Sequence, residues 1–339
     1  MNSLTRGDTI DRRVALVTVF AVAAIFTSVA AQARQGGQLA RIGVLSITGP
    51  TSSTALPPAN WDGFVQGLRE SGYVEGRNIV FEQRYANGKP ELFDELAADL
   101  VRQKVHVIFA RGPSAVAAAR KASRSIPIVG VDASTDPVAA GFVRSLARPG
   151  GNITGVFLDL ADISGKHLEL LQDAIGKFPR AAVIGDLAVN TAQVEAIRTA
   201  AGRVGVRLQV IDVRDRNFDG AFKAATDGRA AALIVPGSPL INAYRTQIVG
   251  QAAKRRLPAI YLNREYVDAG GLMSYGPDLP EMFRRCGVYV GRILGGTRPE
   301  DLPVERPTKF DFSVNMKTAR DLNLKLPESL LLRADHVVE

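Results

Sequence analysis

The chain has 339 residues, of which 46% are hydrophobic, 22% charged and 6% aromatic, and these fractions exclude a disordered or fibrous protein. The net charge of +8 permits acidic partners without identifying one. A single cysteine, Cys286, excludes an intramolecular disulfide and a thiolate zinc site. Because the length exceeds what one hydrophobic core usually supports, we expect two domains.

The first 33 residues have the composition of an export signal. Arg12 and Arg13 precede an apolar run over Val14–Ala31, which ends in the small-residue pattern Ala31-Gln32-Ala33. This order predicts a secretory signal peptide cut after Ala33, leaving 306 residues in the periplasm, with an uncleaved membrane anchor as the alternative. Sec and twin-arginine export both stay open. No later apolar run approaches the ~18–20 residues that span a bilayer.

After the signal, short β-branched runs alternate with longer amphipathic stretches. Buried strands are predicted at Arg41–Ile47, Asn78–Tyr85, Val105–Ala110, Ile126–Val131 and Ile153–Leu158. Helices are predicted between them at Ala59–Glu70, Glu91–Gln103 and Pro113–Ser123. This alternation indicates parallel strands joined by right-handed crossovers, which is a doubly wound α/β sheet.

A second series of the same kind follows the Pro- and Gly-rich stretch at residues 148–152. Its predicted strands are Ala181–Gly185, Arg207–Val213, Ala231–Val235 and Ala259–Leu262, and its predicted helices are Ser164–Lys177, Thr191–Val204, Phe218–Thr226 and Pro239–Arg255. The tail adds strands at Leu272–Tyr275 and Lys309–Val314 around a helix at Leu279–Leu294. It is long enough to return to the first lobe and cross again.

The fold class predicted is therefore α/β, with two doubly wound parallel-sheet lobes joined by hinge strands. The expected division is a signal peptide at 1–33, an N-terminal lobe at 34–157 plus about 266–306, and a C-terminal lobe at 158–265 plus about 307–339.

A search for catalytic groups finds no usable constellation. The histidines His106, His167 and His336 do not lie at metal-ligand spacing, and no nucleophile elbow, phosphate loop or dinucleotide-binding turn is present in the sequence. We expect no enzyme activity, no metal and no cofactor. Lysines and arginines are spread along the chain without a basic block interleaved with aromatic residues, so we expect no nucleic-acid partner.

Polar turns follow several predicted strands, at the sheet edge where doubly wound proteins bind ligands. Ser or Thr at such a turn is also an ordinary helix cap, so each turn alone has a structural interpretation. Two lobes whose polar edges face each other form a ligand cleft. The candidate binding residues are Thr48, Ser52, Ser53, Arg111, Ser114, Asp132, Ser134, Thr135, Asp136, Asn190, Gly237, Ser238, Tyr261, Arg264, Glu265 and Tyr275.

Several longer stretches identify a family when taken together and in order. They are FVQGLRESGYVEG (Phe64–Gly76), DPV (Asp136–Val138), SLARPGGNITG (Ser145–Gly155), AGGLMSYG (Ala269–Gly276), DLPVE (Asp301–Glu305), PTKF (Pro307–Phe310) and LLLRAD (Leu330–Asp335). With these stretches, the chain resembles the ABC-transporter substrate-binding proteins that include tryptophan- and tyrosine-binding members, with a type I periplasmic binding fold. The turn at Gly49–Thr54 departs from the shorter versions that we associate with this family.

The resemblance implies a monomeric periplasmic receptor that closes two lobes on a small solute, an amino acid or a related and possibly aromatic molecule, and delivers it to a membrane permease. For an amino acid, the carboxylate is expected on helix N-termini at Ser114 and at Ser134–Pro137, with added charge from Arg111 or Arg264. The ammonium group is expected on Asp132, Asp136 or Glu265.

Tyr261 and Tyr275 are expected to stack on the solute's apolar part. In the plainer interpretation, Arg111 and Glu265 form ion pairs and both tyrosines belong to the core. A sensor for a membrane signalling receptor and an exported α/β enzyme stay open as alternative functions, and the sequence does not identify the ligand.

Overall fold

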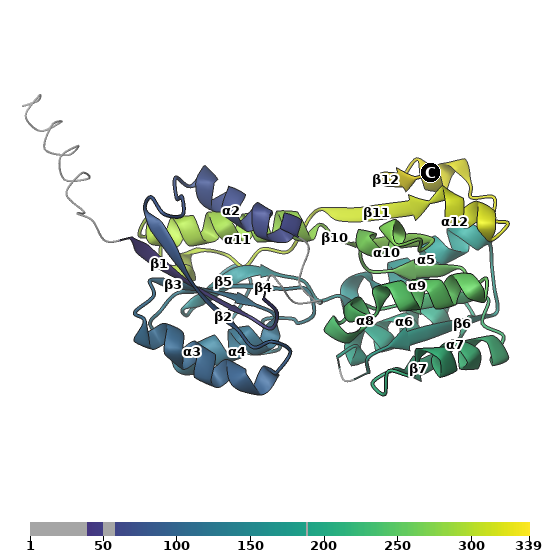
Figure 1. The fold of residues 1–339 in the computed structure, drawn as a ribbon, viewed down its shortest axis with the longest axis horizontal. Coiled ribbons are helices and arrows are strands. Elements are labelled where there is room, and N and C mark those ends of the chain that lie inside the picture. Colours follow the sequence, from purple (N-terminus) through teal and green to yellow (C-terminus); the bar gives the residue numbers. More distant parts are fainter. Residues whose placement is uncertain (1–38, 50–57, 188) are drawn as a thin grey trace, which may run out of the picture.

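The structure, a computed structural model, describes residues 39–49, 58–187 and 189–339. The expected signal peptide and the candidates Ser52 and Ser53 lie outside the described residues. The described chain folds into two α/β lobes that lie side by side, with the N-terminal strands in one lobe and the C-terminus in the other (Figure 1). The two-lobe fold predicted from the sequence is confirmed.

The first lobe contains a five-stranded parallel sheet in the order β2-β1-β3-β4-β5. Its strands are β1 (Ala40–Ser46), β2 (Ile79–Tyr85), β3 (Val107–Arg111), β4 (Ile128–Asp132) and β5 (Ile153–Phe157). One face of the sheet packs against α2 (Pro58–Glu70) and α11 (Leu279–Leu294), and the other against α3 (Phe93–Arg102) and α4 (Pro113–Ala122). Short 3-10 turns lie at Pro90–Leu92 and Pro299–Asp301.

The second lobe has seven strands in the order β12-β11-β10-β9-β8-β6-β7. They are β6 (Arg180–Gly185), β7 (Arg207–Asp212), β8 (Ala232–Val235), β9 (Ala259–Tyr261), β10 (Met273–Pro277), β11 (Phe310–Asn315) and β12 (His336–Val338). The helices are α5 (Ala161–Ile175), α6 (Thr191–Arg203), α7 (Phe218–Asp227), α8 (Pro239–Ala243), α9 (Arg245–Lys254), α10 (Arg264–Asp268), α12 (Met316–Asp321) and α13 (Glu328–Leu331).

Three features of the second lobe differ from the sequence prediction. The expected helix at Pro239–Arg255 divides into α8 and α9 at Tyr244, whose ring packs 4.9 Å from that of Phe218. β11 runs antiparallel to β10, because the chain re-enters this lobe from the first one. The short elements α10, α12, α13 and β12 were not predicted, since three to six residues carry little periodic signal.

The chain passes between the lobes three times, near residues 158–160, 278 and 306–309. The expected return to the first lobe at about residue 266 is wrong, because α10 and β10 belong to the second lobe and only the following helix, α11, packs on the first. Glu305 then forms a parallel bridge with Val156 at the edge of β5 before the last passage.

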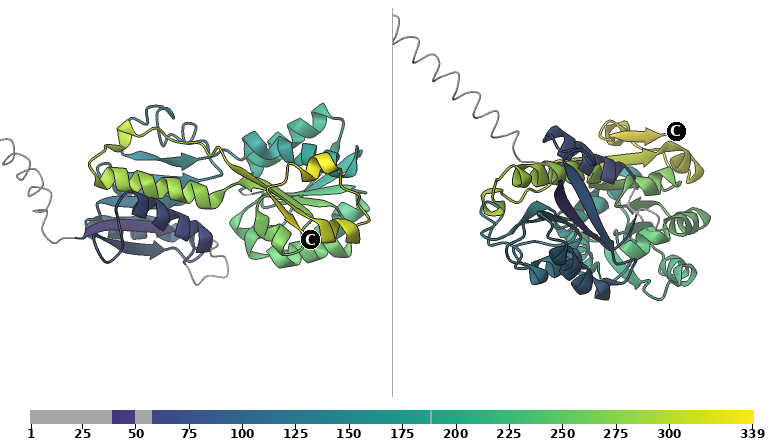
Figure 2. Two further views of the ribbon diagram at one scale, coloured as in Figure 1. Left: turned by 90° about the horizontal axis from the view of Figure 1, so that it is seen from above. Right: turned by 60° about the vertical axis from the view of Figure 1, so that its left-hand side comes forward.

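α11 joins the first lobe through a close contact with α2, beside which it lies in two views (Figure 1; Figure 2, left). A Cβ atom on Gly67 would lie 2.0 Å from the carbonyl oxygen of Arg284, and one on Gly287 would lie 2.2 Å from that of Phe64. The helices thus approach so closely that only glycine fits at the crossing, in the manner of a small-residue helix contact. Gly63 and Gly291 extend the same contact to both sides.

We expect Gly67→Ala and Gly287→Ala each to lower the free energy of unfolding by about 3 kcal/mol, because the added methyl group forces the two backbones apart. Gly250→Ala is the matched control. It lies in the interior of α9 with nothing within 4 Å of the added Cβ, so we expect a gain of about 0.5–1 kcal/mol. Denaturant unfolding measures all three, and equal effects at the three glycines would contradict the close crossing.

Candidate functional site

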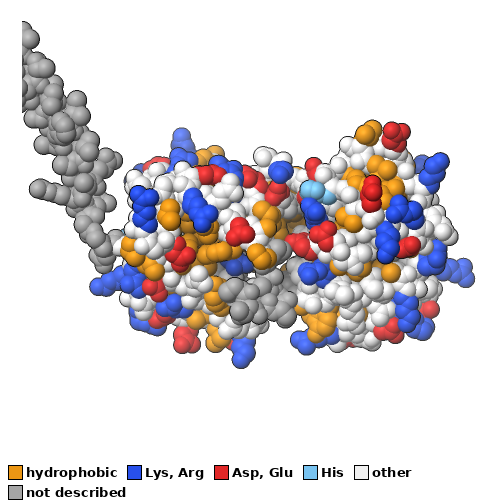
Figure 3. Space-filling model, turned by 45° about the horizontal axis from the view of Figure 1, so that its top comes forward, with side chains coloured by type: hydrophobic (Ala, Val, Ile, Leu, Met, Phe, Trp, Pro, Cys, Tyr) orange, Lys and Arg blue, Asp and Glu red, His pale blue; other side chains and the backbone are white. Residues whose placement is uncertain are grey.

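The carboxyl ends of strands from both sheets meet beside the passage at Leu158–Leu160. Leu158 and Leu160 pack in one small cluster with Leu262, which follows β9, and Ala133, which follows β4. The backbone N–H of Leu158 also donates to the carbonyl of Asp132 at 2.9 Å. The carboxyl edges of the two sheets therefore face each other, and the space-filling view shows the two lobes side by side (Figure 3).

Asp132, at the end of β4, has one satisfied and one unsatisfied carboxylate oxygen. Its Oδ1 accepts from the backbone N–H and the hydroxyl of Ser134, at 3.0 and 2.7 Å. Its Oδ2 is buried and has no partner. Burial raises the pKa of Asp132, although the hydrogen bonds from Ser134 oppose the rise. The carboxylate is thus held in a fixed position with one oxygen available for a donor.

Arg111, at the end of β3, is a half-buried cation. Its guanidinium lies over the Phe283 ring at 5.3 Å from the centroid, and its Nε has no hydrogen-bond partner. Burial lowers the pKa of Arg111 to about 10, and the nearby Tyr85 opposes the shift. No ion pair of Arg111 forms with any residue that the structure describes. The predicted surface ion pair is therefore absent from the described residues, and the cation is available to a ligand.

Two further candidates lie at the same edge of the first lobe. Ser114 is exposed in the first turn of α4, whose N-cap residue Gly112 provides no side-chain cap and has φ of +87°. The first backbone N–H groups of α4 are therefore available to an anion. Thr48 follows β1 and is buried, with its backbone N–H 3.4 Å from the hydroxyl of Ser46.

The loop after β4 differs from the prediction. No helix starts at Ser134–Pro137, where the chain forms a turn instead. Asp136 caps that turn by accepting from the backbone N–H groups of Val138 and Ala139, at 2.8 and 3.3 Å. Its carboxylate thus has a structural role. Ser134 and Thr135 stay at the edge, with their hydroxyls 3.5 Å apart, and Ser134 orients Asp132.

The polar candidates of the second lobe mostly bind one another. Asn190 is fully buried, accepts from the N–H of Asp186 at 3.0 Å and donates to the carbonyl of Gly237 at 3.0 Å. Ser238 is the N-cap of α8 and accepts from the N–H of Ile241. These contacts join two loops at the carboxyl ends of β6 and β8, so they shape this edge of the second lobe.

The two tyrosines do not have the expected role. Tyr261 is buried and stacks on Tyr266 at 4.8 Å, within the core beside α10. Tyr275 lies on the other face of the sheet, where its ring stacks on Phe310 at 5.7 Å and meets His167 of α5 edge-on. Tyr275 therefore belongs to the packing between α5 and β11.

Arg264 and Glu265 lie in the first turn of α10, at the edge of the second lobe. Arg264 is exposed and pairs with Asp268 at 3.6 Å, so its charge is already partly matched. Glu265 is partly exposed in the same turn. Of the second-lobe candidates, only these two present charged groups at the edge.

Sequence reasoning missed two residues of the first lobe. Asn60 of α2 is 2% exposed, and its amide Nδ2 has no partner. Tyr85 ends β2, and a Cβ on Gly49 would lie 3.2 Å from its ring. A signal for both existed, since Tyr85 ends a strand at the ligand edge and Asn60 is a polar residue on the apolar face of a helix.

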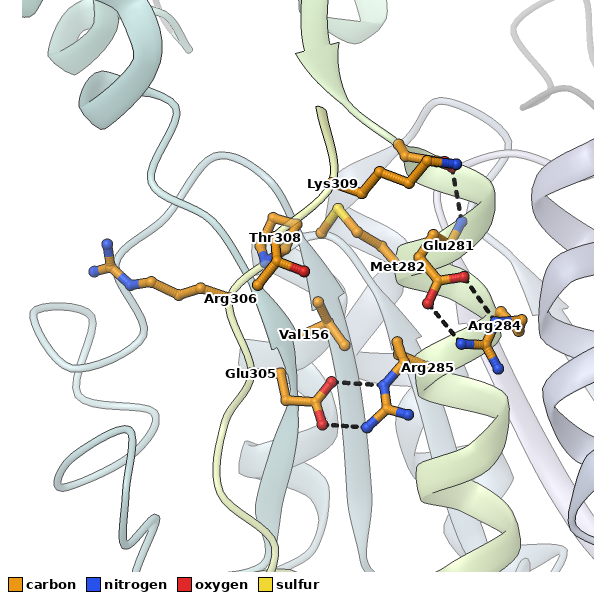
Figure 4. Close-up of a pocket in the computed structure, with 11 residues that line it drawn as sticks. Val156, Glu281, Met282, Arg284, Arg285, Glu305, Arg306, Thr308 and Lys309 are labelled. Carbon is orange, nitrogen blue, oxygen red and sulfur yellow. Dashed lines mark hydrogen bonds and ion pairs between the residues drawn. The ribbon is translucent and has the colours of Figure 1, made fainter. Parts of the chain in front are cut away.

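A separate pocket of about 390 Å³ lies between the start of α11 and the last passage between the lobes. Its carboxylates are each paired with a basic side chain: Glu281 with Arg284, Glu305 with Arg285, and Asp278 with Lys309 (Figure 4). No residue predicted to bind the solute lines this pocket. Its charges stabilise the junction of the hinge segments and do not form the candidate binding site.

The sequence that forms these two facing edges matches a known protein family. Residues 46–338 match the family described as ABC transporter substrate binding protein. This chain belongs to that family. The family consists of substrate-binding proteins, which take up a small-molecule solute and work with an ABC permease.

Relatives of known structure or function agree with the assignment. A tyrosine-binding protein of Clostridioides difficile is 27% identical over 78% of this chain and 76% of its own length. The structure of an ABC domain from Streptococcus pneumonia in complex with L-Trp is similar with a TM-score of 0.77 and 23% identity, over 89% of this chain and all of the other. An open, ligand-free substrate binding protein from Clostridium difficile has a TM-score of 0.68 and 26% identity, over 88% and 99% of the two chains.

The described residues contain neither a membrane-spanning helix nor a metal-binding cluster. None of their helices combines the length and the apolar composition that crossing a membrane requires. Likewise, the described residues contain no group of three or more His, Cys, Asp and Glu side chains placed to hold a metal ion. The single cysteine, Cys286, is fully buried in the first lobe, where burial raises its pKa.

Because Asp132 is buried, we expect the free energy of unfolding of the protein without solute to depend on pH. Because its pKa is higher in the folded than in the unfolded chain, the folded state binds the proton more tightly, and stability falls as the pH rises through the folded-state pKa. Asp132→Asn removes this titration and keeps an oxygen for Ser134. We expect its free energy of unfolding to rise relative to wild type as the pH rises above about 4, the pKa of an ordinary Asp.

Chemical denaturation without solute measures this difference. The control is Asp173→Asn, which changes an exposed carboxylate that pairs with Arg333 on the surface of the second lobe. A difference between Asp132→Asn and wild type that stays constant over this pH range would contradict the assignment.

Proposed function

We propose that the mature chain is a monomeric receptor outside the cytoplasm that captures an amino acid, or a related and possibly aromatic solute, between its two lobes. It delivers this solute to the permease of an ABC importer and performs no catalysis. The observation that carries the proposal is the buried Oδ2 of Asp132, which has no partner and lies at the edge that faces the second lobe. An ammonium group is a fitting donor for such an oxygen.

The relatives support the solute class. One relative is named for tyrosine, and a similar structure holds L-Trp. Both ligands carry an ammonium group, a carboxylate and a ring. The first lobe of this chain has groups for the two charged ends: Asp132 for the ammonium group, and the uncapped N-terminus of α4 for the carboxylate.

The distribution of satisfied and unsatisfied groups suggests an order of events. Asp132 and Arg111 of the first lobe have buried polar atoms without partners, whereas Asn190 and Ser238 of the second lobe bind neighbouring backbone groups. The solute therefore docks first on the first lobe, and the second lobe closes over it by rotation about the passages between the lobes. Closure gives the permease a surface that differs between the empty and loaded receptor.

Thermal-shift and calorimetric titration with L-tyrosine and L-tryptophan test this function. A solute at 100 times its dissociation constant adds about 2.7 kcal/mol to the stability of the receptor, which raises the melting temperature measurably. We expect Asp132→Asn to weaken binding by about tenfold or more, because a charge-assisted hydrogen bond is lost.

Two comparisons make the result specific to the ammonium group. Asp173→Asn should bind as wild type does, and 3-(4-hydroxyphenyl)propionate, which lacks the ammonium group, should bind Asp132→Asn and wild type with similar affinity. The Asp132 site is rejected when L-tyrosine or L-tryptophan binds wild type and Asp132→Asn equally well. The receptor function itself is rejected when a broad panel of amino acids produces no shift and the purified protein carries no solute by mass spectrometry.

A further inference from the structure

Arg111 is a half-buried cation that lacks a counter-charge among the residues that the structure describes. Its Nε has no hydrogen-bond partner, and its guanidinium packs on the Phe283 ring. The loop at residues 50–57 contains no Asp or Glu in its sequence, so it supplies no carboxylate either. An unpaired guanidinium whose Nε is buried without a partner lowers stability, which makes a purely structural role for Arg111 unfavourable.

The amide Nδ2 of Asn60 is a second donor without a partner, and the packing of α2 on β3 indicates where it lies. Phe64 of α2 stacks on Phe109 of β3 with the ring centroids 4.1 Å apart. Arg111 lies two residues beyond Phe109 on the same face of the strand, and Asn60 lies one turn before Phe64 on the same face of the helix. Because α2 runs antiparallel to β3 in a βα crossover, both steps lead toward the ligand-binding edge. Asn60 and Arg111 therefore lie at the same edge, on the face of the sheet that α2 covers.

The aromatic rings of Tyr85 and Phe283 lie near Arg111. Tyr85 ends the strand β2 on the same face as Phe81, and it lies close enough to Arg111 for the cation to influence the pKa of the phenol. Phe283 of α11 forms another wall. Arg111, Asn60, Tyr85 and Phe283, which we call the arginine niche, thus combine a guanidinium and an amide donor with two rings.

The arginine niche and Asp132 lie on opposite faces of the same sheet. Phe109 and Arg111 face α2 and α11, whereas Ile128 and Asp132 of β4 face α3 and α4, since alternate residues of a strand point to opposite sides. The two charges are therefore separated by the sheet edge. Arg111 and Asp132 therefore do not bind the adjacent carboxylate and ammonium groups of the same amino-acid head group.

We propose that the arginine niche is a carboxylate subsite of the solute cleft, separate from Asp132. It selects solutes that present a carboxylate beside an aromatic or apolar group, at a distance from any end that binds Asp132. Guanidinium binds carboxylate through two parallel hydrogen bonds, and the free amide of Asn60 adds a third donor. This inference rests on the proposed function, because it places the solute at the same edge of the first lobe.

Benzoate and benzamide are the matched probes, since they differ only in the charged group. The chain has a single tryptophan, Trp61, which follows Asn60 and packs on Phe64 and Phe81, so its fluorescence reports on the niche. We expect wild type to bind benzoate about tenfold or more tightly than benzamide, and Arg111→Met to bind the two equally. Asn60→Leu should reduce the preference partly.

The melting temperature of the protein without solute distinguishes a binding role of Arg111 from a structural one. We expect Arg111→Met to melt at or above the wild-type temperature, because it removes a half-buried charge that has no counter-charge. Arg111→Lys keeps a charge without the planar fork, so it should retain a weaker preference for benzoate even where the Met variant folds poorly. The control is Arg102→Met, at an exposed arginine that pairs with Asp99 in the same lobe, and it should keep the full preference.

Three outcomes overturn the inference. They are equal affinity of wild type for benzoate and benzamide, an unchanged preference in Arg111→Met, and binding of inorganic phosphate at Arg111 as tight as that of benzoate. The last result would assign the niche to an inorganic anion. None of them affects the proposed function, which is tested through Asp132 and solutes that carry an ammonium group.

Discussion

The close crossing of α2 and α11 is the contact on which the rest of the architecture depends. The two helices come from residues 58–70 and 279–294, and glycines at the crossing let their backbones approach within van der Waals distance. This contact brings the C-terminal part of the chain back to the first lobe after the second sheet is almost complete. The return creates the second and third passages between the lobes, so a helix contact inside one lobe determines the number of hinge segments.

Those hinge segments are joined to one another as well as to the lobes. The N–H of Asp278 donates to the carbonyl of Lys309 at 3.1 Å, and their side chains pair at 2.7 Å. Glu305 is held at the edge of β5 by backbone bonds and by Arg285. Because the segments move together, relative motion of the lobes is favoured as rotation about one axis, which opens and closes the edges that carry Asp132 and Arg111.

The periodicity of the sequence predicted most of the helices and strands, because buried parallel strands and amphipathic helices have strong local patterns. It also placed most of the candidates at the carboxyl ends of parallel strands, where the structure has them. It did not distinguish Asp132, whose carboxylate keeps one oxygen free, from Asp136, whose carboxylate caps a turn. It placed Tyr275 in the cleft although the ring packs against α5. These differences arise from tertiary partners, which a local pattern does not contain.

The empty first lobe keeps two opposite charges apart, the buried Asp132 and the half-buried Arg111. Packing prevents their pairing. Arg111 is held on the α2 side by the Phe283 ring and the stack of Phe64 on Phe109, and Asp132 is held on the α4 side by Ser134. The rigid sheet edge between them thus stores electrostatic free energy that a solute with complementary groups can recover on binding. A receptor of this design gains affinity from the solute's charges and leaves closure to the second lobe, where Asn190 and Ser238 at the facing edge already bind neighbouring backbone groups.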